Sequence, residues 1–466
     1  MGKIGIKFKI FLTVLLVYLF YIAPEYLTAN TTRYIILTKS IVEDKVFYID
    51  KYHELTRDKG FYEGRCYIGA APGLSFMAIP LYLIVRPLVV SLPAAVYQDL
   101  GFNILNIFCT LFLSILPGAA ISVLLYGILQ QFDLKKKERL LIVFTSAFGT
   151  ILFYYSTRFT AHSAGAFLLF SGFYILLKDK SSPSKRYLLF FAGLCLGLAV
   201  LVEYTLIIGS VLCLIYSIFN FKKQTASKYL FLVSGLVLPA FIYMYYHYKC
   251  FENPFALGTA YSEMIGPVPL VVPSPKIIFE LLFGFYRGIF TYMPILLLSI
   301  YGIIIFFRHP KKEHLSEMAF VILFFSFIFL TIAVFASKLW PWGGDFGPRF
   351  FVCVIPFLMI PIAFACRAIE YKMIFGIAAI SIFINWCGVQ YGDADSALTN
   401  IGLFLFGGLN SNIAEWSYKL VNTYIRKLNV ITHFSPFAGF IVLVALIYLI
   451  WRSEIDDTMR AQFSGE

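Results

Sequence analysis

The chain has 466 residues, of which 60% are hydrophobic and only 14% are charged. Soluble domains carry about 45–50% apolar and about 25% charged residues, so a water-soluble fold of this length could not bury so much apolar surface. The apolar residues fall in runs long enough to cross the ~30 Å apolar layer of a bilayer as helices, and no β-barrel alternation is visible. We therefore expect an all-α polytopic membrane protein with about a dozen transmembrane helices in a single domain over residues 1–466.

The net charge of +12 is not a nucleic-acid signal here, because the basic residues lie in short loops between apolar runs. Such a bias sets the orientation of membrane proteins, with basic loops in the cytoplasm. Lys3, Lys7 and Lys9 precede the first apolar run and place the N-terminus there. No small-residue cleavage site follows that run, which is expected to be a retained helix. The sequence thus predicts a multi-pass plasma-membrane protein with both termini in the cytoplasm and no nucleic-acid partner.

The next basic loop, Lys135–Arg139, should also be cytoplasmic, yet two apolar stretches lie before it. If Ala70–Leu92 and Asn103–Leu129 both crossed the bilayer, this loop would lie outside. The first stretch contains several prolines and Arg86, and both features are costly in the middle of a membrane helix. We therefore expect Ala70–Leu92 to be an interfacial or re-entrant segment on the outer side.

With that choice, the other loops sort by charge. The basic loops expected inside are Lys178–Arg186, Lys222–Lys228, Arg308–His314 and Arg367–Lys372. The aromatic and turn-rich loops expected outside are Glu25–Gly69, Arg158–Ser163, Lys249–Lys276, Lys338–Arg349 and Gly392–His433. Tyr187–Phe219 must then be two helices with a tight outer turn near Glu203, and Ile277–Gly288 a second outer interfacial segment interrupted by Arg287. Polar residues gather on the outer side, which favours a site there, although loops are also simply where charged residues are tolerated.

The first outer loop is the most informative segment, and with the following interfacial stretch, residues 25–100, it carries the candidate site. Its motifs are Thr31-Thr32-Arg33-Tyr34, Tyr48-Ile49-Asp50-Lys51-Tyr52, Thr56-Arg57-Asp58-Lys59-Gly60 and Gly69-Ala70-Ala71-Pro72-Gly73. Two further outer stretches are Phe285-Tyr286-Arg287-Gly288-Ile289-Phe290 with Met293-Pro294, and Trp340-Pro341-Trp342-Gly343-Gly344-Asp345-Phe346-Gly347-Pro348-Arg349.

This layout resembles the GT-C superfamily of membrane glycosyltransferases, of the protein mannosyltransferase and lipid A aminoarabinose transferase type. The resemblance covers most of the chain as scattered short motifs. It implies a first outer loop that carries a catalytic carboxylate and runs into interfacial helices through a proline step. It also implies transfer of a sugar from a polyprenyl-phosphate donor to a lipid, glycan or protein acceptor at the non-cytoplasmic face of the membrane.

The sequence departs from that family at two places. Where better-known members have an Asp-Glu pair before the Arg-Tyr, this chain has Asn30 and Thr31, and Asn30 cannot act as a base. The lysine often found before the proline step is replaced by Ala70 and Ala71. Either the base has moved to Asp50 or Asp58, or the chain binds without catalysing.

The expected chemistry assigns candidate residues to two tasks. A carboxylate, Asp58 ahead of Asp50, would take the proton of the acceptor hydroxyl. Arginines, or a divalent metal such as Mg²⁺ or Mn²⁺, would stabilise the departing phosphate. The candidate substrate-binding residues are Arg349, Arg287, Arg158, Asp345, Trp342 and His162. Each has a plainer alternative: a solvated loop carboxylate, an arginine anchored to lipid headgroups, a structural turn, an interfacial tryptophan or a satisfied buried histidine.

Three classes of function follow from these features. The first is a lipid-linked glycosyltransferase. The second is a transporter or flippase of a polyprenyl-linked glycan, which would need a polar path through the bundle, and few charges lie in mid-helix to line one. The third is a non-catalytic membrane subunit, which Asn30 and Thr31 would favour. Of the eight cysteines, only Cys66 and Cys250 lie in expected outer loops, where a disulfide between them is conceivable.

Overall fold

The computed structural model describes residues 5–24, 29–90, 94–181, 185–220, 226–263, 271–339, 346–392, 396–412 and 435–463. Within these ranges the regular secondary structure is helical apart from one short antiparallel hairpin, in which Lys59 pairs with Ile68 and Tyr62 with Arg65, and one isolated bridge. Seven of its helices are long and apolar enough to span a membrane, and five further apolar helices are shorter. The all-α polytopic membrane architecture expected from the composition is therefore confirmed.

The first half of the chain forms α1 (Ile6–Phe20), α2 (Ala29–Lys39), η1 (Ser40–Asp44), η2 (His53–Leu55), β1 (Lys59–Tyr62), β2 (Arg65–Ile68), α3 (Gly73–Val90), α4 (Ala94–Thr110), η3 (Leu111–Ile115), α5 (Leu116–Leu129), α6 (Lys136–Phe148), α7 (Leu152–Ser156), α8 (Ala161–Ser181), α9 (Arg186–Val202), η4 (Tyr204–Leu206) and α10 (Ile207–Asn220). The second half forms α11 (Ala226–Phe251), η5 (Gly258–Tyr261), α12 (Pro275–Phe283), α13 (Ile289–Tyr292), α14 (Leu296–Arg308), η6 (Lys312–His314), α15 (Leu315–Leu339), η7 (Arg349–Phe351), α16 (Ile355–Leu358), α17 (Ile362–Ala365), α18 (Tyr371–Tyr391), α19 (Ala397–Gly407) and α21 (Pro436–Phe463).

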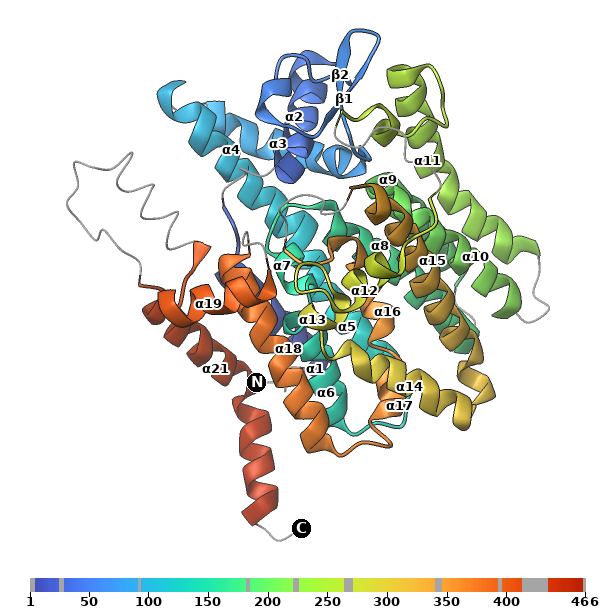
Figure 1. Ribbon diagram of the computed structural model, residues 1–466, viewed down its shortest axis with the longest axis vertical. Coiled ribbons are helices and arrows are strands. Elements are labelled where there is room, and N and C mark those ends of the chain that lie inside the picture. Colours follow the sequence, from blue (N-terminus) through green and yellow to red (C-terminus); the bar gives the residue numbers. More distant parts are fainter. Residues whose placement is uncertain are drawn as a thin grey trace.

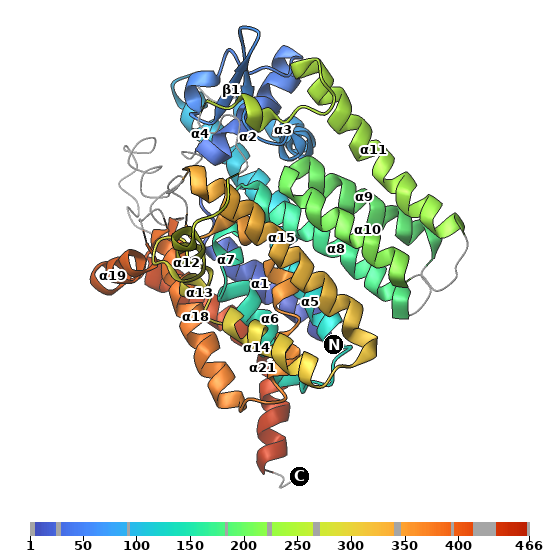
Figure 2. The same ribbon diagram turned by 45° about the vertical axis from the view of Figure 1, so that its right-hand side comes forward.

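The first-loop elements gather at one end of the helical bundle. Figure 1 shows α2, α3 and the β1–β2 hairpin together at the top, while α21 extends beyond the bundle at the opposite end. Figure 2 shows the same separation after rotation, with α8, α9, α10 and α11 side by side below the hairpin. The hairpin end is the outer end in the topology expected from the loop charges.

Helix α3 lies at the hairpin end and does not run through the bundle. Its first residue, Gly73, contacts the backbone of Leu201 at the end of α9, and Val89, near its other end, contacts Gly101 of α4. One turn further along α4, Asn106 donates hydrogen bonds to the backbone oxygens of the residues that follow α1, 2.8 Å and 3.1 Å away. Both ends of α3 thus lie level with the outer ends of other helices. That residues 70–92 form an interfacial segment stays a prediction, because α3 is long and apolar enough to span a membrane.

The prolines of α3 act differently from the expectation. Pro80 and Pro87 lie inside one uninterrupted helix of 18 residues, so they do not break it. Arg86 lies on an exposed face, where its Nε is 3.4 Å from Glu43 Oε1. The helix accommodates these residues because it lies along the bundle end, where backbone groups left unpaired by proline can find other partners.

The opposite end of the bundle holds both termini and a basic loop. Lys9 of α1 lies 3.3 Å from the carboxylate of Glu454 in α21, and Lys136 at the start of α6 pairs with the same carboxylate. The beginning of α1, the loop before α6 and the last helix therefore share one side. That shared side fits a scheme in which all three are cytoplasmic; the orientation itself stays a prediction.

Two further boundaries expected from the sequence are confirmed. The run 187–219 divides into α9 and α10, and the break falls at Glu203, whose backbone is extended. Residues 277–288 contain the short α12, which ends before the turn that holds Arg287. In contrast, the conceivable Cys66–Cys250 disulfide is not formed, and both buried thiols are free.

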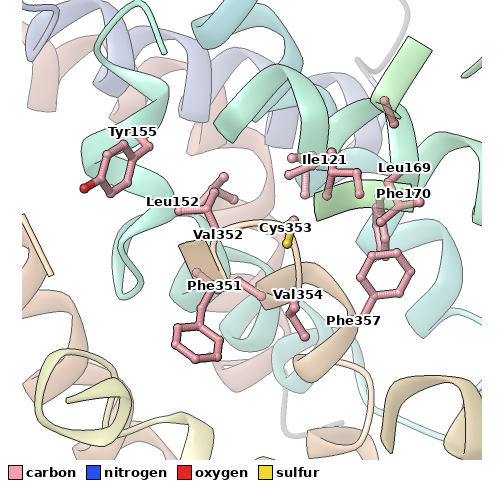
Figure 3. Packing of buried hydrophobic residues seen from close by; sticks show 14 of the residues in the cluster. Ile121, Leu152, Tyr155, Leu169, Phe170, Phe351, Val352, Cys353, Val354 and Phe357 are labelled. Carbon is pink, nitrogen blue, oxygen red and sulfur yellow. The ribbon is translucent and has the colours of Figure 1, made fainter. Parts of the chain in front are cut away.

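The apolar core joins the middle of the bundle to the outer end. Phe170 of α8 packs edge-on against Phe357 of α16, with ring centroids 4.9 Å apart. Figure 3 shows these rings beside Val354 and Cys353, with Leu152 and Tyr155 of α7 further along the same core. This packing fixes α7 and η7, which carry Tyr155 and Arg349, against the rest of the protein.

Candidate functional site

A buried ion pair joins helix α2 to the segment that leads into β1. Arg33 of α2 pairs through Nη1 with the Asp58 carboxylate, and its other amino group donates to the Tyr34 hydroxyl at 3.0 Å. The side chains of Arg33 and Asp58 are only 14% and 12% exposed. Thr56 fixes the turn, since its hydroxyl accepts from the Asp58 N–H and donates to the carbonyl of Ala29. Asp58 is therefore held in one position by contacts on both sides.

The second carboxylate oxygen of Asp58 is buried and has no hydrogen-bond partner in the part of the chain that the structure describes. It lies against Gly69, where a Cβ atom would approach it to 2.5 Å. A larger residue at position 69 would displace the carboxylate. A buried acceptor without a donor is costly, because it has lost water and gained nothing in return. Such an atom can accept a hydrogen bond from a ligand hydroxyl.

Arg349 connects this carboxylate to the arginines of the other outer loops. Burial lowers the pKa of Arg349, and the positive charges of Arg287 and Arg33 lower it further, while Tyr155 and Asp58 act in the opposite direction. The side chains of Arg287, Arg33, Tyr155 and Asp58 are thus close enough to Arg349 for their charges or dipoles to act on it. Two arginines of the outer loops and the Asp58–Arg33 pair therefore share one buried electrostatic environment.

Tyr155 of α7 lies on the arginine side of this environment. Burial raises the pKa of its hydroxyl, and the neighbouring Arg349, Arg287 and Arg158 oppose that rise. The hydroxyl donates to the backbone oxygen of Phe346 at 2.8 Å. The charges of three of the predicted substrate-binding arginines therefore act on one tyrosine hydroxyl. We call Arg33, Arg158, Arg287, Arg349, Tyr155 and Asp58 the arginine cluster.

The arginines of the cluster differ in how they are held. Arg287 is 0% exposed, and its Nη1 donates to the carbonyl of Gly347 at 2.5 Å, just before Arg349. Arg158 instead lies flat over the Tyr154 ring, with its guanidinium carbon 3.6 Å from the ring centroid. Neither arrangement is that of a headgroup anchor extended into lipid. Both keep positive charge inside the protein, where an anion would be strongly attracted.

A histidine–glutamate pair borders the cluster. His162, at the start of α8, has Nδ1 3.1 Å from Glu203 Oε2. The imidazole also packs edge-on against Tyr155, with ring centroids 5.1 Å apart, and against Phe350 at 5.9 Å. His162 therefore contacts the residue that follows Arg349 as well as the tyrosine on which the arginine charges act.

Asp50, the second candidate base, has a different environment. Its Oδ2 accepts from Arg65 at 2.8 Å, and its Oδ1 accepts from the backbone N–H of Cys66 at 2.7 Å. Both carboxylate oxygens are used to hold the β1–β2 hairpin against the preceding loop. The structure thus separates the two candidate carboxylates: Asp58 lies beside the arginines, and Asp50 braces the hairpin.

Two candidate residues, Trp342 and Asp345, lie outside the described residues, as does Trp340. Within the described residues no group of three His, Cys, Asp or Glu side chains is arranged to hold a metal ion. The one carboxylate in the arginine cluster is already paired, and its neighbours are cations, which disfavour a second cation. These residues do not fit a divalent metal.

Sequence reasoning missed the partners that organise the site. The sequence presents Arg33 only within an Arg-Tyr motif and Glu203 as a polar residue at a predicted helix end, and no motif points to Tyr155. The available signal is position, because Tyr155 and Glu203 lie at or beside helix ends, close to predicted outer loops.

The fold is similar to that of membrane proteins of known structure. ArnT from Cupriavidus metallidurans, bound to undecaprenyl phosphate, matches with a TM-score of 0.54 and 11% identity over 95% of this chain and 75% of that chain. An Archaeoglobus fulgidus oligosaccharyltransferase in complex with Zn and sulfate matches with a TM-score of 0.44 and 12% identity, over 91% of this chain and 56% of that one. No protein-family model and no curated protein sequence matches the chain.

The match to ArnT is structural, because at 11% identity only the backbone arrangement is shared. The chain therefore shares the fold of ArnT, in agreement with the fold that the first-loop motifs implied. The oligosaccharyltransferase match is weaker and adds nothing to this conclusion.

Proposed function

We propose that the chain is an integral membrane glycosyltransferase that moves a sugar from a polyprenyl-phosphate donor to an acceptor hydroxyl at the non-cytoplasmic face. The observation that supports this most strongly is the arginine cluster beside a buried carboxylate at the hairpin end of a GT-C fold. ArnT, which shares the fold, binds undecaprenyl phosphate. The acceptor would be a hydroxyl of a lipid, glycan or protein.

In this proposal Arg349, together with Arg287 and Arg158 near Tyr155, binds the donor phosphate. As the bond between the anomeric carbon and the phosphate oxygen breaks, the electron pair moves onto the phosphate. Guanidinium groups held inside the protein stabilise that charge without reorganising at the moment of reaction. Burial strengthens the effect, because the same charges would be screened in water. The cluster in this proposal is a phosphate site and not a set of lipid anchors.

Asp58 is proposed as the general base for the acceptor hydroxyl. Its paired oxygen is held by Arg33, which orients the carboxylate, and its other oxygen is buried beside Gly69 without a hydrogen-bond partner in the described residues. An acceptor hydroxyl bound there would lose its proton to the carboxylate as it attacks the anomeric carbon. Asp50 is proposed only as a structural residue, since both its oxygens already serve the hairpin. No step is assigned to a metal ion.

The proposal is tested by the lipids of cells that lack the protein. Loss of a transferase should cause its polyprenyl-phosphate sugar to accumulate in the outer leaflet, as measured by mass spectrometry of lipids released by a membrane-impermeant phosphodiesterase. The wild-type gene should reverse the accumulation, and an Asp58→Asn gene should not. Accumulation confined to the inner leaflet would identify a flippase, and no change in polyprenyl-linked sugars would contradict the proposed function.

A further inference from the structure

His162 is placed so that one ring nitrogen is fixed and the other is left for a ligand. Nδ1 faces Glu203 Oε2 at 3.1 Å. In the described residues Nε2 has no hydrogen-bond partner. The ring is held between the edges of Tyr155 and Phe350. A histidine whose inner nitrogen is bound to a carboxylate has a defined orientation and a higher affinity for a proton at the outer nitrogen.

Glu203 is built as a counter-ion for this histidine. It lies at the break between α9 and α10, and its other oxygen, Oε1, accepts from the Thr205 hydroxyl at 3.2 Å. Burial raises the pKa of Glu203, but His162, Thr205 and Arg33 outweigh burial and hold that pKa below its ordinary value. The carboxylate is therefore ionised at neutral pH. It faces Nδ1 of His162 as a negatively charged partner.

Other charged and titratable groups act on Tyr155, Glu203 and Arg349, the neighbours of His162. They come from α2, from α7 and the residues that follow it, from the loop before α13, and from η7: Arg33, Tyr155, Arg158, Arg287 and Arg349. Four are cations, and the carboxylates of Glu203 and Asp58 oppose them, the latter paired with Arg33. A negatively charged ligand bound beside these groups would be attracted to the cations.

We propose that His162 is a proton-coupled phosphate ligand: it binds the donor phosphate through Nε2 as an imidazolium, with Glu203 as its counter-ion. This inference rests on the proposed function. It adds a fourth cationic group at the phosphate end, beside Arg349, Arg287 and Arg158. Unlike the arginines, this group loses its charge within the physiological pH range. Donor binding would therefore take up a proton, and affinity would fall as the pH rises.

The test is calorimetric titration of the full-length protein in detergent with undecaprenyl methyl phosphate. This phosphodiester carries one charge at every pH used, so any pH dependence belongs to the protein. Wild-type affinity should fall on the order of 10-fold between about pH 5.5 and pH 8. Near neutral pH the apparent enthalpy should also vary with the ionisation enthalpy of the buffer, as expected for proton uptake. The His162→Gln protein should bind weakly at every pH, with no proton uptake.

Two other variants keep the test decisive. Glu203→Gln retains the hydrogen-bonding shape but removes the counter-ion, so affinity should be lost at a lower pH than in the wild type. His314→Gln is the matched control. His314 is also 9% exposed, but it lies in η6 and stacks on Phe132. It should bind like the wild type.

The outcomes separate the two proposals. If the wild type does not bind the phosphodiester at any pH, the proposed function fails. If it binds, but His162→Gln keeps the wild-type pH dependence and proton uptake, the proton-coupled role of His162 is wrong while the proposed function stands. If His162→Gln does not fold, an unchanged pH midpoint in Glu203→Gln overturns the inference instead.

Discussion

Arg33 in helix α2 forms an ion pair with Asp58, which lies 25 residues further along the chain, directly before strand β1. Both side chains are almost completely buried. Attraction between buried charges offsets the cost of removing each from water, and losing one partner strands the other. The pair therefore positions the carboxylate and also joins the hairpin to α2. This double role sets what mutations at either position will do.

Replacing Asp58 with asparagine should abolish transfer while leaving donor binding nearly intact. Asparagine keeps the size and the hydrogen bonds but cannot take a proton from the acceptor. Loss of a general base costs on the order of 10²-fold or more in rate. The rate of sugar release from the polyprenyl-phosphate donor, measured alongside donor affinity, checks this prediction. Near-normal transfer by Asp58→Asn would remove Asp58 from the role.

Asp50→Asn is the matched control, since it makes the same chemical change in the same loop. Because Asp50 braces the hairpin through Arg65 and Cys66, we expect a lower melting temperature with little change in rate. The Arg65 side chain is largely exposed, so the loss of stability should be modest. A stable but inactive Asp50→Asn protein would mean that Asp50, and not Asp58, is the general base.

Arg349→Lys should weaken donor use more than it weakens folding. Lysine keeps the positive charge but loses the planar fork that grips two phosphate oxygens. We expect on the order of 10-fold weaker donor binding, about the value of one charge-assisted hydrogen bond. Arg86→Lys, on the exposed face of α3, is the control and should bind normally. Equal donor turnover by Arg349→Lys and the parent would mean that Arg349 does not bind the phosphate.

The stability of the Arg33–Asp58 pair can be measured in a double-mutant cycle with Arg33→Gln and Asp58→Asn. Each single change leaves a buried charge without its partner, whereas the double change leaves none. We expect a coupling free energy of about 1–3 kcal/mol from denaturant unfolding in detergent. Additive effects of the two changes would show that the ion pair does not couple α2 to the hairpin.

The orientation of the chain is tested by labelling single cysteines in intact cells. A cysteine at position 63, in the β1–β2 turn, should react with a membrane-impermeant maleimide. One at position 136 should react only after the cells are opened, because Lys136 lies with the two chain ends on the expected cytoplasmic side. Labelling at position 136 in intact cells would contradict the predicted topology.

Much of the architecture could be predicted, because bilayer physics acts on local sequence. The apolar runs predicted the helices, whereas the non-crossing position of residues 70–92 stays a prediction. The break at Glu203 followed from the length of the run around it. These inferences need only hydrophobicity, charge and residue counting along the chain.

The partners within the site could not be predicted in this way. Asp50 and Asp58 stand eight positions apart in the sequence and look alike there, yet one braces a hairpin and the other pairs with an arginine. Loop spacing does not determine which side chains meet, since that depends on how β1, β2 and α2 pack. The same reason explains why Cys66 and Cys250 do not form a disulfide. Their position in expected outer loops made a disulfide conceivable but did not determine whether the two thiols meet.

The central claim is that this chain transfers sugar from a polyprenyl phosphate, and turnover by the purified protein tests it most directly. The full-length protein would be reconstituted with polyprenyl-phosphate sugars extracted from its own host membranes, together with a host envelope extract as the acceptor. We expect release of free polyprenyl phosphate and a matching gain of sugar on the acceptor, both lost in Asp58→Asn. If the wild-type protein releases no more polyprenyl phosphate than Asp58→Asn does, the account of this protein as a glycosyltransferase is contradicted.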